Sequence, residues 1–238
     1  MADILEIEHL SAGYGNAVVL GDVSLSVPEG QSLALLGRNG MGKTTLINSI
    51  VGVTRWRGGV IRLGGVDITK LRPEQRAHAG IGWVPQERNI FKSLTVEENM
   101  TCVARKGPWN VARVYEMFPR LQERRGNMGN QLSGGEQQML AVGRALVLNP
   151  RLMLLDEPTE GLAPIIVQEL MAALSRIVRD EGLSTIIVEQ HAQKILQVTH
   201  QAAILERGAV VYRGASETLR HDDATLERYL GVTAAEHV

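Results

Sequence analysis

Short apolar runs and longer amphipathic segments alternate along most of the chain. Runs typical of β-strands lie at residues 4–9, 23–27, 31–36, 59–63, 81–84, 152–155, 184–188, 202–206 and 209–213. Segments with helical periodicity lie at residues 44–51, 134–148, 164–180, 192–198 and 215–230, and a less regular helical pattern covers residues 95–125. This alternation favours an α/β fold in which a mostly parallel sheet carries helices on both faces.

Two parts of the chain depart from that alternation. The opening strands follow one another without an intervening helix, which favours an N-terminal antiparallel β part and a mixed sheet overall. Residues 95–125 contain breaks at Gly107-Pro108 and Pro119, which is typical of an inserted helical subdomain. We therefore expect a single domain over residues 1–238. Its core comprises about 1–90 and 150–230, and its helical subdomain about 91–149.

Composition excludes several classes of protein. The 238 residues include 25 basic and 26 acidic side chains, a net charge of −1, so the basic surface typical of nucleic-acid-binding proteins is missing. The single cysteine, Cys102, cannot form an intrachain disulfide, and we expect it to be buried. The N-terminus lacks a signal-peptide pattern, and no apolar run approaches the ~20 residues that span a bilayer. We expect a cytoplasmic protein that meets the membrane only through a partner and needs no nucleic acid.

A glycine-rich motif follows the strand expected at 31–36. Residues 37–45 read GRNGMGKTT and fit G-x-x-x-x-G-K-[ST] in full, with a strand before and a helix after. Such a loop turns successive backbone N–H groups toward phosphate oxygens, and the helix N-terminus adds a positive dipole end. We expect Lys43 to reach the β- and γ-phosphates of ATP and Thr44 to bind Mg²⁺. The predicted phosphate-binding residues are Gly37, Arg38, Asn39, Gly40, Met41, Gly42, Lys43, Thr44 and Thr45.

Two carboxylates end the apolar strand expected at 152–155. The carboxyl ends of buried strands form the edge of the sheet where ligands bind in open α/β folds. Asp156 therefore suits coordination of Mg²⁺, and Glu157 suits orienting or deprotonating the water that attacks the γ-phosphate. In the absence of the upstream phosphate loop, the same pair could equally be ordinary surface carboxylates.

A second glycine pair lies between these two motifs, in the run LSGGEQQ at 132–138. Ser133 and Glu136 have the spacing of a capping box at the start of a helix. Gly134 and Gly135 would leave that helix start open to an anion, yet the phosphate loop already provides one anion site. Ser133, Gly134, Gly135 and Glu136 are therefore candidate nucleotide contacts.

The run LSGGEQQ resembles the signature of ABC ATPases, and the order of the other motifs matches that family along the whole chain. The resemblance implies a P-loop core of the RecA-like kind, and a head-to-tail dimer in which ATP lies between one subunit's phosphate loop and the other's signature. It also implies that Tyr14 stacks on adenine. Gln86, at the position of the family's Gln-loop, would contact Mg²⁺ or the attacking water and link the nucleotide to a transmembrane partner.

The chain departs from the family pattern at two positions. The family usually has a histidine after the strand expected at 184–188, where it contacts the γ-phosphate. Here Gln190 occupies that position, with His191 next to it as the alternative. A glutamine amide donates a hydrogen bond but carries no titrating charge. In the loop after the acidic strand, Ala163 stands where an aspartate is common, so an aspartate link across the dimer is in doubt.

Several segments resemble the smaller ATPase of branched-chain amino-acid importers, among them WVPQERNIFKSLTVEEN, DEPTEGLAP and VEQ. That resemblance implies a hetero- or homodimer with a homologous ATPase, two transmembrane permease subunits and, indirectly, a solute-binding protein. Relatives that serve amides or urea, soluble ABC proteins without a transport role, other phosphate-loop enzymes and a regulatory module without turnover are the alternatives.

Overall fold

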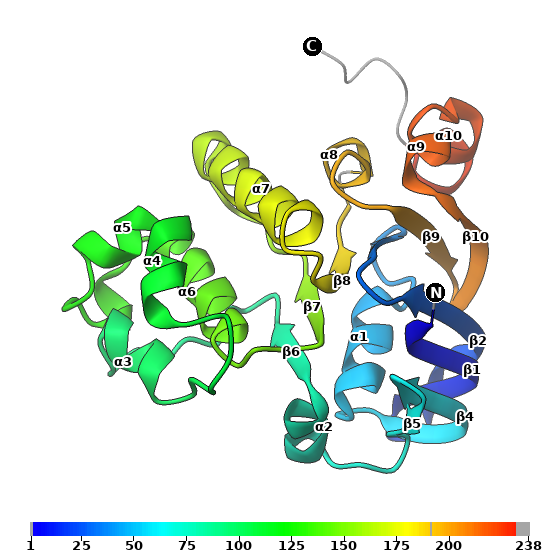
Figure 1. Cartoon of the computed structure of the whole chain (residues 1–238). Helices are drawn as coiled ribbons and strands as arrows, with labels where there is room; N and C mark the ends of the chain where they lie inside the picture. Colours follow the sequence, from blue (N-terminus) through cyan, green and yellow to red (C-terminus); the bar gives the residue numbers. More distant parts are fainter. Residues whose placement is uncertain (1, 191, 232–238) are drawn as a thin grey trace.

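The structure is a computed structural model that describes residues 2–190 and 192–231. Its strands form two sheets (Figure 1). The four-stranded sheet has the order β2 (Ala17–Pro28), β1 (Asp3–Tyr14), β4 (Arg55–Leu63) and β5 (Val66–Asp67). The six-stranded sheet has the order β10 (Ala209–Ala215), β9 (Gln201–Glu206), β3 (Ser32–Leu36), β8 (Ser184–Val188), β7 (Leu152–Asp156) and β6 (Ile81–Val84).

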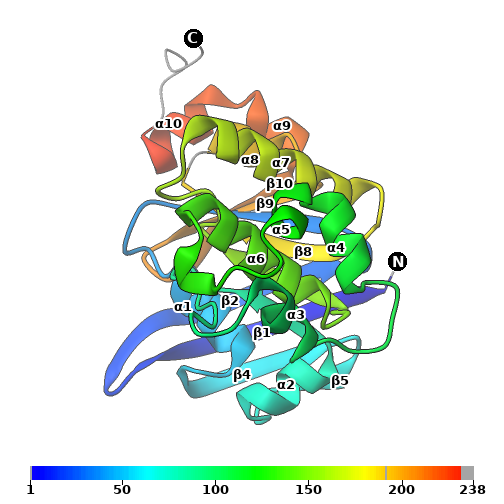
Figure 2. The ribbon, with the colours of Figure 1, turned by 90° about the vertical axis from the view of Figure 1, so that its left-hand side faces the viewer.

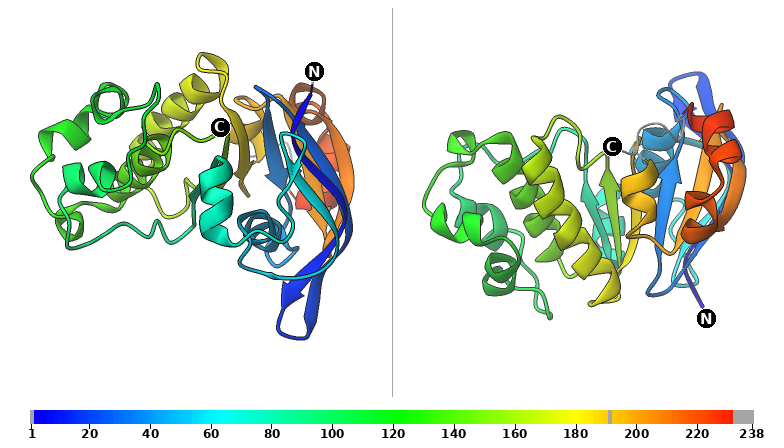
Figure 3. Two further views of the ribbon diagram at one scale, coloured as in Figure 1. Left: turned by 60° about the horizontal axis from the view of Figure 1, so that its bottom comes forward. Right: turned by 90° about the horizontal axis from the view of Figure 1, so that it is seen from above.

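The helices of the core pack between the sheets and on the outer face of the six-stranded sheet. They are α1 (Lys43–Val51), α2 (Pro73–Ala79), α7 (Pro164–Arg179), α8 (Ala192–Leu196), α9 (Ser216–Arg220) and α10 (Asp223–Leu230). The helical subdomain comprises α3 (Val96–Thr101), α4 (Val111–Met117), α5 (Pro119–Glu123), a 3₁₀ turn (Gly129–Gln131) and α6 (Gly134–Leu146). Figure 2 shows these helices in front of the sheets, and Figure 3 shows them at the opposite end of the molecule from the antiparallel sheet.

The strands of the six-stranded sheet bury both faces, which explains their continuous apolar sequence. In β3, Leu33 and Leu35 pack in the core shared with α1 and the antiparallel sheet, whereas Ala34 and Leu36 pack in the core under α6 and α7. Strands β6, β7, β8, β3 and β9 run parallel, and β10 alone is antiparallel to its neighbour. The opening strands form a sheet of their own, so the mixed character of the six-stranded sheet comes from β10.

The prediction from the sequence pattern missed some helices and strands and made others too short. Strands β1 and β2 extend well beyond the expected residues 4–9 and 23–27. The prediction was too short because register shifts between the two strands break the simple alternation of apolar and polar residues. Helix α2 lies in a stretch interpreted only as polar, and the two-residue strand β5 was not expected. Cys102, expected to be buried, is exposed at the C-cap of α3. The irregular helical region at 95–125 does form short helices, as predicted.

Candidate active site

The carboxyl ends of four adjacent parallel strands bring most of the predicted residues together. Strand β3 leads into the phosphate loop, β8 into Gln190, β7 into Asp156 and Glu157, and β6 into Gln86. A cavity of about 300 Å³ lies at this edge of the sheet. It is lined by Val19, Asn39, Gly40, Gly42, Lys43, Thr44, Thr45, Gln86, Glu157, Glu160 and Gln190. Sequence reasoning predicted nine of these residues and missed Val19 and Glu160.

Glycines in the phosphate loop occupy positions that other residues would strain. Gly37 has a φ of 150°, and a Cβ added there would lie 2.4 Å from the carbonyl oxygen of Leu205. Gly42 caps the N-terminus of α1 with a φ of 104°, in the left-handed region. The loop therefore passes close to β9 and still turns directly into α1, which leaves the N-terminus of that helix open toward the cavity.

Lys43 is a buried cation, 4% exposed, that forms a long ion pair with the buried carboxylate of Glu157. Its Nζ donates hydrogen bonds to the carbonyl oxygens of Gly37 at 2.7 Å and Arg38 at 3.2 Å. The nearest carboxylate oxygen is Oε1 of Glu157, at 3.7 Å. Burial lowers the pKa of Lys43, and the charges of Glu157 and Asp156 oppose that shift. A phosphate placed in the cavity would supply the negative charge that the protein provides only in part.

Asp156 is a carboxylate that the surrounding protein leaves poorly neutralised. It is 1% exposed, and its Oδ1 accepts a long hydrogen bond of 3.4 Å from the hydroxyl of Thr44. Burial raises the pKa of Asp156 to about 6, although the hydrogen bond from Thr44 opposes the shift. A carboxylate next to a hydroxyl, facing a phosphate site, is a donor set that suits Mg²⁺, which keeps several waters and binds phosphate oxygens at the same time.

Glu157 faces the cavity from a strained backbone position. It is 8% exposed and has a φ of 47°, which is uncommon for a residue other than glycine. Gln190 donates a hydrogen bond of 2.8 Å from Nε2 to Oε2 of Glu157. The predicted γ-phosphate contact and the predicted base are therefore paired. The alternative contact, His191, lies outside the described residues.

Gln86 lines the cavity, and its side chain makes a contact that the sequence did not suggest. Its Nε2 donates a hydrogen bond of 2.6 Å to Oε2 of Glu160, in the loop that follows the acidic strand end. Arg88, two residues further on, donates to the side chain of Gln138 in α6 and to the backbone carbonyl of Glu160. The only signal for Glu160 in the sequence was its place in DEPTE, three residues after Glu157. The segment after β6 thus connects the core to the signature helix.

Tyr14 and the signature lie outside the lining of this cavity. Tyr14 ends β1, is 45% exposed, and its hydroxyl accepts a hydrogen bond of 2.8 Å from Nδ2 of Asn48 in α1. Its ring is thus held beside the helix that starts at the phosphate loop. This position agrees with a place for adenine next to the phosphates.

The signature forms the predicted helix start. The hydroxyl of Ser133 accepts a hydrogen bond from the backbone N–H of Glu136, and Oε2 of Glu136 accepts one from the backbone N–H of Ser133. A Cβ added at Gly135 would lie 2.6 Å from Cγ2 of Ile166, so packing against α7 also requires that glycine. Ser133 and Gly134 are exposed and can meet another molecule.

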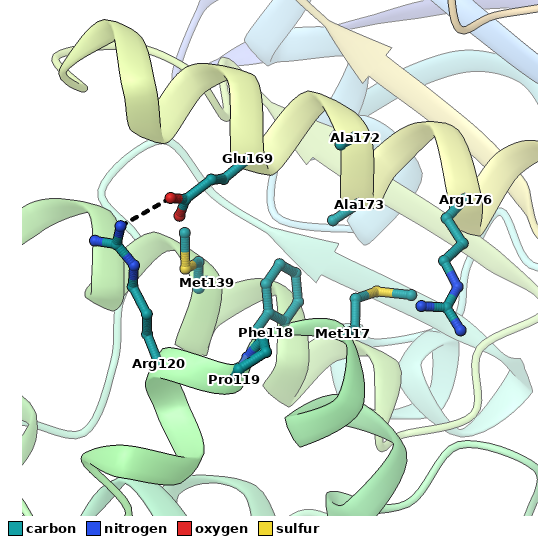
Figure 4. Close-up of a pocket in the computed structure, with 9 residues that line it drawn as sticks. All are labelled: Met117, Phe118, Pro119, Arg120, Met139, Glu169, Ala172, Ala173 and Arg176. Atoms are coloured by element: carbon teal, nitrogen blue, oxygen red, sulfur yellow. Dashed lines mark hydrogen bonds and ion pairs between the residues drawn. The ribbon is translucent and has the colours of Figure 1, made fainter.

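A second cavity, of about 460 Å³, lies between α5, α6 and α7 (Figure 4). Met117, Phe118 and Met139 form much of its apolar wall, and Arg120 pairs with Glu169 at one edge, with 2.8 Å between nitrogen and oxygen. It contains none of the predicted site residues. The larger cavity is therefore a gap between the helical subdomain and α7, and the predicted catalytic residues Glu157, Gln190 and Gln86 line the smaller one.

Residues 20–160 match the family model described as "ABC transporter". This chain belongs to the ABC transporter family. The match covers more than half of the chain, from strand β2 through the phosphate loop and signature to Glu160. The resemblance in the sequence is confirmed, and with it the assignment as an ATP-binding and ATP-hydrolysing subunit.

Two kinds of curated relative are similar over nearly the whole chain. The high-affinity branched-chain amino acid transport ATP-binding protein BraG of Pseudomonas aeruginosa is 38% identical over 96% of this chain and 100% of its own length. The probable branched-chain amino acid transport ATP-binding protein LivF of Archaeoglobus fulgidus is 35% identical over 92% and 95%. The lipopolysaccharide export system ATP-binding protein LptB of Haemophilus influenzae is 37% identical over 96% and 97%.

Solved structures agree on the fold. An ATP-binding cassette of an ABC transporter in an ADP conformation has a TM-score of 0.81 at 24% identity, over 97% of this chain and 98% of its own. The ABC ATPase fold predicted for this sequence is thereby confirmed. Within residues 2–190 and 192–231, no helix is both long and apolar enough to cross a membrane.

Proposed function

We propose that this ABC ATPase works as one half of a head-to-tail dimer, with ATP and Mg²⁺ held between the phosphate loop of one subunit and the signature of the other. The observation that supports this is the separation of the two anion-binding helix starts. The phosphate loop lines the cavity with Lys43 and Glu157, whereas the exposed Ser133 and Gly134 contribute nothing to it. Each half-site is then completed by a second ATPase subunit, identical or homologous.

In the proposed mechanism, the phosphate loop and Lys43 bind the β- and γ-phosphates. Mg²⁺ would be held by Thr44 and Asp156, with Gln86 near it, and would neutralise charge on the phosphate oxygens. Glu157 orients and deprotonates the attacking water, and Gln190 contacts the γ-phosphate through its amide. Gln86 would meet the metal with its Oε1, while its Nε2 donates a hydrogen bond of 2.6 Å to the carboxylate of Glu160.

The dimer would drive two transmembrane permease subunits, with the chain on the cytoplasmic face of the membrane. Closure around ATP and opening after hydrolysis would switch the permeases between two states. Branched-chain or related amino acids, received from a solute-binding protein, are the solute we propose. The BraG and LivF relatives support this proposal, as does the resemblance of the segments DEPTEGLAP and VEQ. A second candidate is the ATPase of an exporter, because LptB is similar to the same extent.

Two measurements test these proposals. Purification of the tagged full-length chain from native membranes should recover two permeases, and those subunits in proteoliposomes should accumulate radiolabelled leucine in the presence of ATP and the solute-binding protein. Recovery of exporter subunits, or ATPase activity without leucine uptake, would contradict the import proposal and leave the ATPase intact. Recovery of the chain without any membrane subunit would contradict the transport role itself.

A further inference from the structure

Glu189 is a buried carboxylate to which the proposed mechanism gives no role. It follows the last residue of β8 and precedes Gln190, and it is 4% exposed. Burial raises the pKa of Glu189, so its charge costs free energy where it lies. Among the described residues it forms no ion pair. A group placed at such a cost needs compensating hydrogen bonds, and Thr159 supplies two of them.

Two groups of Thr159 donate hydrogen bonds to the carboxylate of Glu189. The backbone N–H of Thr159 donates to Oε1 at 3.0 Å, and the Thr159 hydroxyl donates to the same oxygen at 2.8 Å. Thr159 is itself buried, at 8% exposure. Glu189 therefore fixes the chain two residues after Glu157, where the strand end turns into the loop that contains Glu160.

That turn needs to be held, because the φ of 47° at Glu157 is in the left-handed region. An L-residue pays roughly 1–2 kcal/mol for this conformation, and it persists only where the surroundings enforce it. The restraints come from three consecutive residues. The carbonyl oxygen of Val188 accepts a hydrogen bond of 3.0 Å from the Glu157 N–H, Glu189 accepts from Thr159, and Gln190 donates to the carboxylate of Glu157.

We propose that Glu189 is a positioning residue for ATP hydrolysis, which holds the strained turn at Glu157–Thr159 and so aims the carboxylate of Glu157 into the cavity. This inference rests on the role proposed for Glu157. The phosphate loop follows β3 and has its own contacts to β9, so binding of the nucleotide does not depend on the pair of Glu189 and Thr159. Glu189 should therefore affect turnover far more than affinity.

The test measures kcat and KM for ATP of the assembled transporter in proteoliposomes and, in parallel, the hydrogen–deuterium exchange of the Thr159 amide in the same assembly. Glu189→Ala should lower kcat by about 10- to 100-fold, as a misplaced catalytic group does, and change KM by no more than about twofold. It should also speed exchange at Thr159. Glu189→Gln keeps an acceptor oxygen and should recover most of the activity. Thr159→Val should lower kcat less than Glu189→Ala, since only the hydroxyl donor is lost, and Thr159→Ser should resemble the unchanged protein.

Thr185 provides the matched control. It lies in β8, is fully buried, and its hydroxyl has no hydrogen-bond partner among the described residues. Thr185→Val should leave both kcat and the exchange unchanged. If Glu189→Ala fails to fold, Thr159→Val still tests the pair.

Three results would overturn the proposal: unchanged kcat in Glu189→Ala and Thr159→Val, unchanged exchange at Thr159, or equal losses of kcat, ATP affinity and melting temperature. Failure of the ATPase role itself is recognised separately, because the unchanged protein would then show no turnover while the exchange difference at Thr159 persists.

Discussion

The two helix starts that can bind an anion, at α1 and at α6, differ in how far their polar and charged groups are already satisfied within the chain. The start of α1 lies in a cavity lined by the buried Lys43 and Glu157, with the buried Asp156 next to Thr44, and the charges there are only partly compensated. The start of α6 is exposed, and Ser133 and Glu136 already satisfy each other's backbone N–H groups. The first is an incomplete site that the proposed function completes with phosphate and Mg²⁺. The second is an exposed surface whose capping hydrogen bonds are already made, so it can act only on another molecule.

This difference indicates which helix start determines nucleotide binding and which one determines the assembly of the complete site. Burial makes charges expensive, so a ligand that completes the first site gains a large free energy. The second site is already satisfied, and it gains only from its helix dipole and from the close approach that Gly134 permits. Changes at the α1 side should therefore affect nucleotide binding already in a single chain. Changes at the α6 side should appear only in the assembled transporter.

The largest effect is expected for Glu157→Gln. Removal of the base should lower the rate of ATP hydrolysis by about 10²–10⁴-fold, the usual contribution of a general base, while nucleotide binding is retained. Phosphate release and a nucleotide titration on the same preparation measure the two properties. Wild-type turnover in this variant would rule out the role proposed for Glu157.

Lys43→Ala should weaken ATP binding by about 10- to 100-fold, because a charge-assisted contact worth about 1.5–3 kcal/mol is lost. Equilibrium binding of a fluorescent ATP analogue to the lone chain gives the value. Lys106→Ala, at an exposed position between α3 and α4, is a suitable control that should bind as the unchanged chain does. An unaltered dissociation constant for Lys43→Ala would contradict the phosphate-loop assignment.

Ser133→Arg should separate the two helix starts. ATP affinity of the lone chain should stay unchanged, whereas turnover of the assembled transporter should fall by about tenfold or more, since an anion-binding helix start worth up to about 2 kcal/mol is blocked. Nucleotide titration and phosphate release in proteoliposomes provide the comparison. A loss of affinity in the lone chain would mean that the signature acts on the nucleotide within one subunit.

Asp156→Asn should stabilise the nucleotide-free chain at pH 8 and do so less at pH 5. The folded pKa of Asp156 is raised to about 6, so its contribution to stability is present below the unfolded pKa and is lost as the pH rises through about 6. Ionisation thus destabilises the folded chain by roughly 1–3 kcal/mol at pH 8. Melting temperatures at the two pH values measure this, and an advantage that does not grow with pH would contradict it. The variant should also lose the stabilisation by Mg²⁺-ATP.

The smallest effect concerns the helix start that lacks a cap. Ala163 is the N-cap residue of α7 and makes no side-chain hydrogen bond there, in contrast to Ser133 at α6. Ala163→Asp should therefore stabilise the chain by about 1 kcal/mol. Urea unfolding measures the change, and Ala172→Asp, on the exposed face of the same helix, controls for added charge. A destabilised Ala163→Asp variant would show that the start of α7 has no free N–H group to bind.

The chemistry was largely predictable from sequence because it depends on local patterns. A phosphate loop needs glycines at fixed spacing between a strand and a helix, so residues 37–45 identify it wherever they occur. The apolar run before Asp156 placed that carboxylate at a strand end, and the capping box at Ser133 was visible as S-x-x-E. Strand β8 was predicted with its observed bounds. Helix α2 was missed because it is short and its one buried residue is the polar Arg76, so it has little apolar periodicity.

What the tertiary structure alone decided is how these patterns meet. Strand order places β8 between β3 and β7, and that order brings Gln190 to Glu157 and Glu189 to Thr159. Gln190 and Glu157 are separated by more than thirty positions in the sequence. No local pattern reports such contacts, because they depend on which strands are neighbours in the sheet. The sequence by itself determined the phosphate loop, the acidic strand end and the signature. The structure decided that the phosphate loop and Glu157 line one cavity and that the signature lies outside it, because the first two follow neighbouring strands of one sheet edge and the signature does not.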